Sequence, residues 1–208
     1  MKKNMLRKNA LVISPHQDDW VIGCGGIISK LNKFNWGVLY FYSADKKAEA
    51  IDSEKLFEIE RHWFIDCLPR SIKYNFDINK IVQIIRSFKP SLLIIVNNDG
   101  DRDHDFCCEI IKEAIFLTEN NEEEKLGKKW EIDSIIGYSV WSEIKKPQFS
   151  VDITDEMNNK VSAINLHKSQ IKTFDYESLI KNRAKIYGLL SGYEFAEAFE
   201  VIKIKEII

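Results

Sequence analysis

The sequence lacks a long apolar run. None reaches the ~20 consecutive residues that a membrane-spanning helix requires, so we expect no membrane partner. Residues 10–13 are apolar and follow a basic start, but this stretch is too short for the core of a signal peptide. The polar residues 15–19 end it. We therefore expect a buried strand at this position and a cytoplasmic protein.

An excess of charge of one sign is also missing. The 208 residues include 30 Lys and Arg against 32 Asp and Glu, which gives a formal net charge of -2. Such a balance produces no long-range attraction to nucleic acid, which we therefore do not expect as a partner. The hydrophobic fraction of 45% and the charged fraction of 30% are typical of a globular protein. We expect one domain over residues 1–208.

Cysteine is scarce and has no metal-binding or redox spacing. The four cysteines are Cys24, Cys67, Cys107 and Cys108, and no CxxC pair occurs among them. The spacing therefore does not indicate a zinc ribbon or a thioredoxin motif. In a cytoplasmic protein we expect all four to be reduced and mostly buried.

Short apolar runs alternate with helical patterns along the chain. We expect strands at residues 10–14, 38–43, 91–96, 134–141 and 149–153, and an edge strand at 199–207. Helical spacing predicts helices at residues 25–35, 46–68, 78–88, 104–117, 156–173 and 178–189. The alternation of strands and helices predicts an α/β fold, a mostly parallel sheet with helices on both faces.

Two polar loops follow predicted strands, at residues 15–26 and 97–104. In open α/β sheets, ligands bind outside the carboxyl ends of the strands, where the strand order reverses. If the strands at 10–14 and 91–96 are neighbours, these loops face each other. The sequence then predicts a binding site between them.

Metal-ligating residue types occur in both loops. His16 and Asp19 are three residues apart, and His104 from the second loop would complete a His-Asp-His set. Catalytic zinc takes three such ligands and a water whose pKa it lowers towards ~7. Asp18 would then act as the general base. Two readings stay open: a turn with a capping Asp, and a calcium or magnesium site.

Several motifs resemble those of one known family. They are the SPHQDD and GCGG segments at 14–19 and 23–26, NDGDRDH at 98–104, VDIT at 151–154, HKSQ at 167–170 and YEFAEAF at 193–199. In this order they are similar to the motifs of the LmbE-like (PIG-L) N-deacetylases. The matches extend over nearly the whole chain, and together they are specific.

The resemblance implies a Rossmann-like domain that hydrolyses an N-acetyl group, often on a glucosamine conjugate. It implies zinc, bound at His16, Asp19 and His104, with Asp18 as the base. Iron(II) also suits two histidines and a carboxylate. Asp103 would orient a neighbouring side chain. The partner would be a small acetylated molecule, and a homo-oligomer is compatible with this class of enzyme.

The sequence departs from the family pattern at two informative positions. Trp20 replaces a glutamate; it either packs against a helix or forms a platform for a sugar ring, a role also open to Trp141. Asp101 stands where the family usually has a histidine that stabilises the developing oxyanion. Either a protonated Asp101 donates there, or His167 supplies the donor, or turnover is low. Our hypothesis is that His167 supplies it.

Three functions therefore compete. The first is a metal-dependent hydrolase that removes an N-acetyl group from a small amino-sugar conjugate through metal-activated water. The alternatives are a metal-binding protein with little turnover and a hydrolase of a different amide. A nucleotide cofactor is disfavoured, because Gly23, Gly25 and Gly26 form only a partial dinucleotide fingerprint.

Overall fold

The computed structural model describes residues 7–42, 46–59, 61–65 and 77–205; Cys67 lies outside these ranges. The described strands are β1 (Asn9–Ser14), β2 (Asn35–Tyr40), β3 (Arg61–Phe64), β4 (Pro90–Val96), β5 (Ser134–Tyr138), β6 (Phe149–Asp152) and β7 (Ala196–Ile204). The helices are α1 (Asp19–Lys30), α2 (Lys47–Lys55), α3 (Ile78–Phe88), α4 (Arg102–Asn120), α5 (Met157–Ile164), α6 (Lys168–Ile171) and α7 (Tyr176–Ser191). A 3-10 turn covers Glu124–Leu126.

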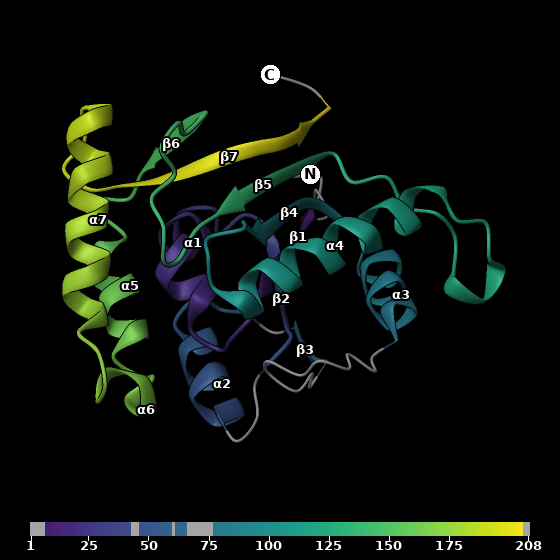
Figure 1. The fold of residues 1–208 in the computed structure, drawn as a ribbon, viewed down its shortest axis with the longest axis horizontal. Helices are drawn as coiled ribbons and strands as arrows, with labels where there is room; N and C mark the ends of the chain where they lie inside the picture. The colour runs from purple at the N-terminus through teal and green to yellow at the C-terminus, as the bar shows by residue number, and fades with distance from the viewer. Residues whose placement is uncertain (1–6, 43–45, 60, 66–76, 206–208) are drawn as a thin grey trace, which may run out of the picture.

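The strands form one sheet in the order β3-β2-β1-β4-β5-β7-β6 (Figure 1). The first five strands in this order are parallel, and β7 runs antiparallel to both β5 and β6. From β1 the chain proceeds outward to β2 and β3, and then returns to the other side of β1 at β4. The strand order therefore reverses between β1 and β4.

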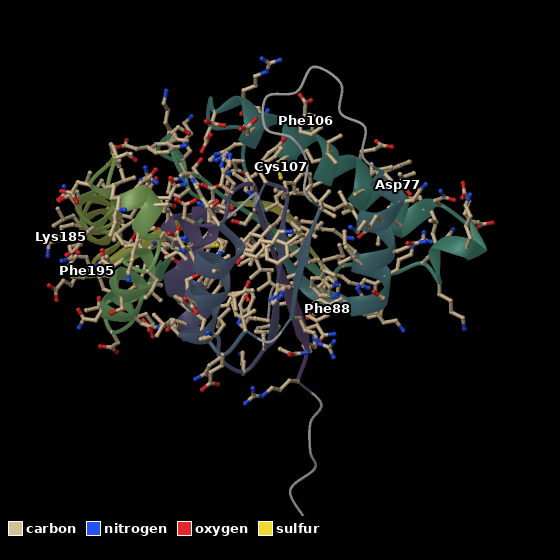
Figure 2. The ribbon with its side chains drawn as sticks, turned by 90° about the horizontal axis from the view of Figure 1, so that it is seen from below. Asp77, Phe88, Phe106, Cys107, Lys185 and Phe195 are labelled. Carbon is tan, nitrogen blue, oxygen red and sulfur yellow. The ribbon has the colours of Figure 1, made fainter. Side chains whose placement is uncertain are left out.

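Helices cover both faces of the sheet. Helices α3 and α4 pack against each other on one side, and α1 packs against α5 on the other (Figures 1 and 2). Strands β1 and β4 lie at the centre, so their apolar side chains are buried on both faces. The predicted α/β fold with a mostly parallel sheet is confirmed.

The helices and cysteines of the described ranges add two smaller observations. None of the helices in the described ranges is long and apolar enough to cross a bilayer. Cys24, Cys107 and Cys108 are buried, as expected.

The prediction of one helix over residues 46–68 is wrong. Helix α2 ends at Lys55, and Glu58 adopts the left-handed conformation with a φ of 54°. The chain then forms β3, which pairs in parallel with β2. The charged pattern favoured a helix, but the ring of Phe64 stacks on Tyr40, at 5.0 Å between centroids. Tertiary packing at the sheet edge decides the structure here.

Other elements also differ from their predicted extents, among them β2, which covers Asn35–Tyr40 instead of residues 38–43. The helix expected over residues 156–173 is broken between α5 and α6, and His167 lies in that break. The edge strand expected at the C-terminal end begins earlier, at Ala196. Residues 196–199 pair with β6, and the second half of β7 pairs with β5. Strand β7 therefore lies between β5 and β6, so the prediction of an edge strand is wrong.

The glycines near the N-terminus permit close packing of α1. A Cβ atom on Gly23 would lie 2.0 Å from the ring of Tyr138, and one on Gly26 would lie 2.6 Å from Ile153. Helix α1 begins at Asp19, earlier than the predicted residue 25, so these glycines are inside it. Their smallness serves contacts with β5 and the segment after β6. This explains the glycine-rich segment without a nucleotide.

Candidate metal centre

The candidate site lies where the strand order reverses. Strands β1 and β4 are hydrogen-bonded neighbours, as the sequence-based argument required. The segment after β1 carries His16, Asp18 and Asp19, and the segment after β4 leads to His104 in the first turn of α4. The two polar loops therefore meet at the carboxyl edge of the sheet.

The two predicted histidine ligands converge on one carboxylate oxygen of the third ligand, Asp19. Asp19 Oδ2 is 3.1 Å from His16 Nδ1 and 3.1 Å from His104 Nε2. It also accepts a hydrogen bond from the backbone N–H of His16 at 2.7 Å. The candidate ligand atoms of the three residues all lie within 4.8 Å of one another.

Two further carboxylates hold the outer nitrogens of the histidines. Asp99 lies with both oxygens near His104 Nδ1, at 3.1 and 3.0 Å. Asp103 Oδ2 lies 3.3 Å from His16 Nε2, so it contacts a neighbouring side chain as its predicted role requires. Asp99 was not singled out from the sequence. Its only signal there is an Asp three residues after the end of a buried strand and five residues before a candidate ligand.

The charges of Asp19, His16 and His104 shift one another's pKa values. Burial opposes ionisation of Asp19, but the neighbouring His104 and His16 outweigh it and hold the pKa of Asp19 well below its usual range. Burial also opposes the charged form of His16, yet Asp19 and Asp103 raise its pKa to about 10. For His104, Asp19 and Asp99 overcome burial and raise the pKa to about 11. Protons on both rings thus balance the carboxylates when no cation is present.

The residues fit a transition metal. Asp99 holds Nδ1 of His104, so the buried Nε2 faces Asp19 Oδ2 at 3.1 Å, where a cation could bind both atoms. The two 3.1 Å separations from Asp19 are close to the edge of about 3.4 Å expected for a tetrahedral site with bonds of about 2.1 Å. Nitrogen donors backed by carboxylates are the usual arrangement around zinc.

Asp18 is buried beside this set, with 2% of its surface exposed. Its burial, together with the negative charge of Asp19, raises its pKa to about 7. It is the residue before the first helical residue of α1, but its side chain makes no capping hydrogen bond there. The carboxyl group is therefore not used to hold the helix.

Asp101 caps the N-terminus of helix α4. Its Oδ1 accepts hydrogen bonds from the backbone N–H groups of Asp103 at 2.8 Å and His104 at 3.3 Å. These are contacts of an acceptor, so they do not support the hypothesis that Asp101 donates to an oxyanion. Its contribution is to begin α4 and thereby position the two residues it caps.

His167 lies in the break between α5 and α6. Its side chain is fully buried, and neither ring nitrogen has a hydrogen-bond partner among the described residues. Burial lowers its pKa to about 4, although Glu49 and Asp19 act in the opposite direction. The imidazole is therefore neutral at pH 7. Glu49 also anchors the start of α6, accepting from Ser169 N at 2.9 Å and Ser169 Oγ at 2.7 Å.

The two tryptophans proposed for substrate binding have opposite environments. Trp20 is fully buried and packs edge-on against Phe57, with 4.9 Å between ring centroids. The sugar-platform role for Trp20 is wrong, because its ring has no surface to offer. Trp141 is 43% exposed, and its backbone N–H donates to Asp99 Oδ2 at 2.9 Å. It stands beside the residue that holds His104.

Comparison with known families agrees with this geometry. The PIG-L family, described as GlcNAc-PI de-N-acetylase, matches residues 11–115, just over half of the chain. The chain belongs to this family. A relative of this PIG-L protein is the diacetylchitobiose deacetylase of Thermococcus kodakarensis. It is 25% identical over 223 aligned residues, which cover 94% of this chain and 83% of the relative.

Solved structures show the same fold. The N,N'-diacetylchitobiose deacetylase of Pyrococcus horikoshii, in complex with an inhibitor, matches with a TM-score of 0.80 at 22% identity, over 94% of this chain and 84% of that one. The 4-carboxy-2-hydroxymuconate hydratase GalB of Pseudomonas putida KT2440 matches with a TM-score of 0.79 at 17% identity, over 97% and 99%. The second protein is named for a different reaction, so the fold alone does not determine the chemistry.

Proposed function

We propose that this PIG-L protein is a metal-dependent N-deacetylase that hydrolyses the N-acetyl group of a small amino-sugar conjugate. The observation that carries the proposal is the convergence of His16, Asp19 and His104 with the buried Asp18 at the carboxyl edge of the sheet. The deacetylase activity named for the Thermococcus relative supports the same reaction. As parts of the proposal we retain a single domain over residues 1–208, a cytoplasmic location and a small-molecule partner.

The metal ligands would be His16, Asp19 and His104. We propose zinc as the ion, with iron(II) as the alternative that the same ligand types accept. Such an ion would supply Lewis acidity, polarising the acetyl carbonyl and lowering the pKa of a water molecule. Asp99 and Asp103 hold the outer nitrogens of the two histidines, which keeps the inner nitrogens turned towards Asp19.

Asp18 would move the proton. Its carboxylate takes a proton from water as the water oxygen bonds to the acetyl carbon. It then gives that proton to the amine nitrogen as the carbon–nitrogen bond breaks. The products are acetate and the free amine. The role fits a carboxyl group that is buried beside the ligands and is not engaged in capping its helix.

His167 would donate a hydrogen bond to the acetyl oxygen as negative charge develops there. A neutral imidazole carries one N–H donor, and the buried ring spends neither nitrogen on a partner in the described part of the protein. This assignment compensates for Asp101, whose capping contacts give the site no donor at that position. Preorganised donors of this kind are worth about 10² to 10³ in rate.

A second candidate function is favoured by Asp101 itself. Without a donor at this position, a metal-binding protein with little turnover, or a hydrolase of a different amide, would use the same ligands. These alternatives differ from the first proposal only in activity. The test must therefore measure the metal and the reaction on the same samples.

The test is elemental analysis of purified protein combined with an assay of acetate release from N-acetylglucosamine and from N,N'-diacetylchitobiose. The samples are wild type, His104→Ala, and His62→Gln as a control, because His62 pairs with Glu54 away from the ligand set. We expect about one zinc or iron per chain and acetate release in wild type and control, and loss of both in His104→Ala.

Other results would redirect or end the proposal. Metal without acetate release would favour a different amide or a low-turnover binder. Absence of metal from wild type, even after zinc is added back, would contradict both the function and the ligand assignment.

A further inference from the structure

An exposed aromatic pair lies beside the candidate metal centre. Of the five tryptophans, Trp141 is the exposed one, with 43% of its surface accessible. Its ring meets Phe174, which is 45% exposed, in an edge-to-face arrangement with 5.8 Å between centroids. Tyr176 backs both rings, at 6.0 Å from Trp141 and 5.0 Å from Phe174. We call Trp141, Phe174 and Tyr176 the aromatic corner.

The aromatic corner is joined to the metal centre by Asp99. One oxygen, Asp99 Oδ2, accepts the backbone N–H groups of Val140 and Trp141, both at 2.9 Å. The same carboxylate contacts His104 Nδ1 at 3.0 Å. Asp99 therefore contacts both the backbone of Trp141 and the predicted metal ligand His104.

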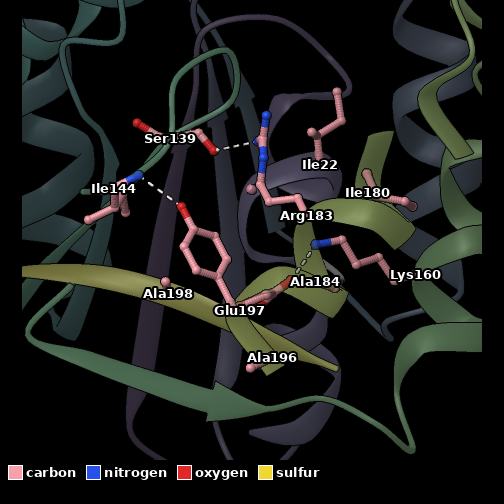
Figure 3. Close-up of a pocket in the computed structure, with 12 residues that line it drawn as sticks. Ile22, Ser139, Ile144, Lys160, Ile180, Arg183, Ala184, Ala196, Glu197 and Ala198 are labelled. Atoms are coloured by element: carbon pink, nitrogen blue, oxygen red, sulfur yellow. Dashed lines mark hydrogen bonds and ion pairs between the residues drawn. The ribbon is translucent and has the colours of Figure 1, made fainter. Parts of the chain in front are cut away.

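The loop that carries Trp141 is also held from the side of α7 (Figure 3). The guanidinium of Arg183 donates to the carbonyl of Ser139 at 3.3 Å, and the backbone N–H of Ile144 donates to the Tyr187 hydroxyl at 2.8 Å. The cavity in this region has space for about one water molecule, roughly 20 Å³, so it is not a substrate pocket. Its polar groups serve to fix the loop. The exposed ring is thus preorganised.

On its other side, the aromatic corner borders a groove through Phe174 and Tyr176. Burial and the negative charges of Asp18 and Asp19 raise the pKa of Tyr176 to about 12, which places this side chain within the field of the catalytic carboxylates. A groove of about 450 Å³ is lined by residues that include Phe174 and Tyr176. This volume is in the usual range of small-molecule sites, about 300–1,000 Å³.

We propose that Trp141 and Phe174 form a subsite for a second sugar ring of the substrate, the ring that does not carry the acetyl group being removed. The proposal rests on the deacetylase function proposed above. A pyranose ring presents a face of C–H groups, and a rigid, half-exposed aromatic ring is a suitable partner for that face. Contiguous exposed apolar side chains, unlike isolated ones, are typical of binding sites. The substrate class is therefore a disaccharide or longer amino sugar.

The test is an NMR titration that compares the dissociation constants of N,N'-diacetylchitobiose and N-acetylglucosamine. Zinc-loaded protein in the Asp18→Asn background is used, so that the sugars are not consumed. Trp141→Ala is compared with Trp141→Phe, which keeps an aromatic face. The matched control is Phe116→Ala, because Phe116 is an aromatic side chain of similar exposure, 59%, on a different element, α4. Acetate release by wild type is measured separately.

We expect the Asp18→Asn protein to bind the disaccharide at least about tenfold more tightly than the monosaccharide. Trp141→Ala should lose most of this preference, Trp141→Phe should keep most of it, and Phe116→Ala should not alter it. Equal affinity for the two sugars, no binding of either, or a preference that survives Trp141→Ala would overturn the subsite. A preference that depends on Trp141, without acetate release by wild type, would support the subsite and contradict the deacetylase function.

Discussion

Replacement of Asp99 by alanine removes an acceptor that four groups share, one of which is the backbone N–H of Asp101 at 3.2 Å. The backbone N–H groups of Val140 and Trp141 and the imidazole of His104 all point at this carboxylate at 2.9–3.1 Å. Each net hydrogen bond contributes about 1 kcal/mol, and a buried donor left without a partner costs about 1–3 kcal/mol. Since the Asp99 side chain is buried, we expect Asp99→Ala to lower the free energy of unfolding by about 3–5 kcal/mol.

For a chain of this length, that loss corresponds to a fall in Tm of about 10 °C, at roughly 2–4 °C for each kcal/mol. The milder variant Asp99→Asn should stay folded and lower zinc affinity by about 10- to 100-fold, because the outer nitrogen of His104 loses its carboxylate. Urea denaturation and chelator competition measure the two effects.

Asp103→Asn is the informative comparison. Its contact with His16 Nε2 is longer, at 3.3 Å, and the His16 side chain is 27% exposed, so water can replace the lost interaction. We expect a smaller loss of zinc affinity than for Asp99→Asn. If Asp103→Asn weakens zinc binding more than Asp99→Asn does, then the assignment of Asp99 as the main support of the site is refuted.

Three further changes test other parts of the structure. Because the pKa of His167 is about 4 when folded and about 6.5 when unfolded, the unfolded chain takes up a proton that the folded one does not, and stability falls as pH drops from 6.5 towards 4. Between pH 7 and 4.5, the free energy of unfolding of metal-free His167→Gln should therefore fall by about 2–3 kcal/mol less than that of wild type, as measured by urea denaturation. Equal losses in the two proteins would contradict a buried neutral imidazole. Asp101→His should lower stability by about 1 kcal/mol through loss of the cap, without a large gain in acetate release; a gain of about 10² in rate would show that His167 does not supply the donor. Gly23→Ala should destabilise by about 3 kcal/mol, because its Cβ would lie 2.0 Å from the Tyr138 ring, whereas Gly25→Ala, with its nearest contact at 3.5 Å, should cost less than about 1 kcal/mol in thermal denaturation.

The central fold follows from local sequence patterns. The apolar runs of β1 and β4 have the length of strands, and polar residues follow each of them. Both strands can therefore be identified without any information on contacts. Their adjacency then follows from the usual topology of α/β sheets, and it brings His16, Asp19 and His104 together. The ligands could be predicted because they lie in motifs directly after these strands.

What could not be predicted depends on contacts between distant segments. Strand β3 is short and charged, and only its pairing with β2 distinguishes it from a continuation of α2. The role of Asp99 arises from backbone N–H groups of the loop after β5, about 40 residues further along the chain. Trp20 could not be separated from Trp141 by sequence, since burial of an indole depends on what packs over it.

Asp99 links two regions that would act on different parts of the substrate. It holds His104, which belongs to the metal centre, and it holds the backbone of Trp141, which belongs to the aromatic corner. A change that displaces this carboxylate should therefore affect both regions, whereas Asp103 contacts the metal centre through His16. We expect Asp99→Asn to reduce the preference for the disaccharide together with zinc affinity, and Asp103→Asn to reduce zinc affinity alone. The NMR titration and the chelator competition, applied to both variants, distinguish this coupling from two independent sites: if Asp99→Asn leaves the disaccharide preference unchanged, the metal centre and the aromatic corner are not coupled through this residue.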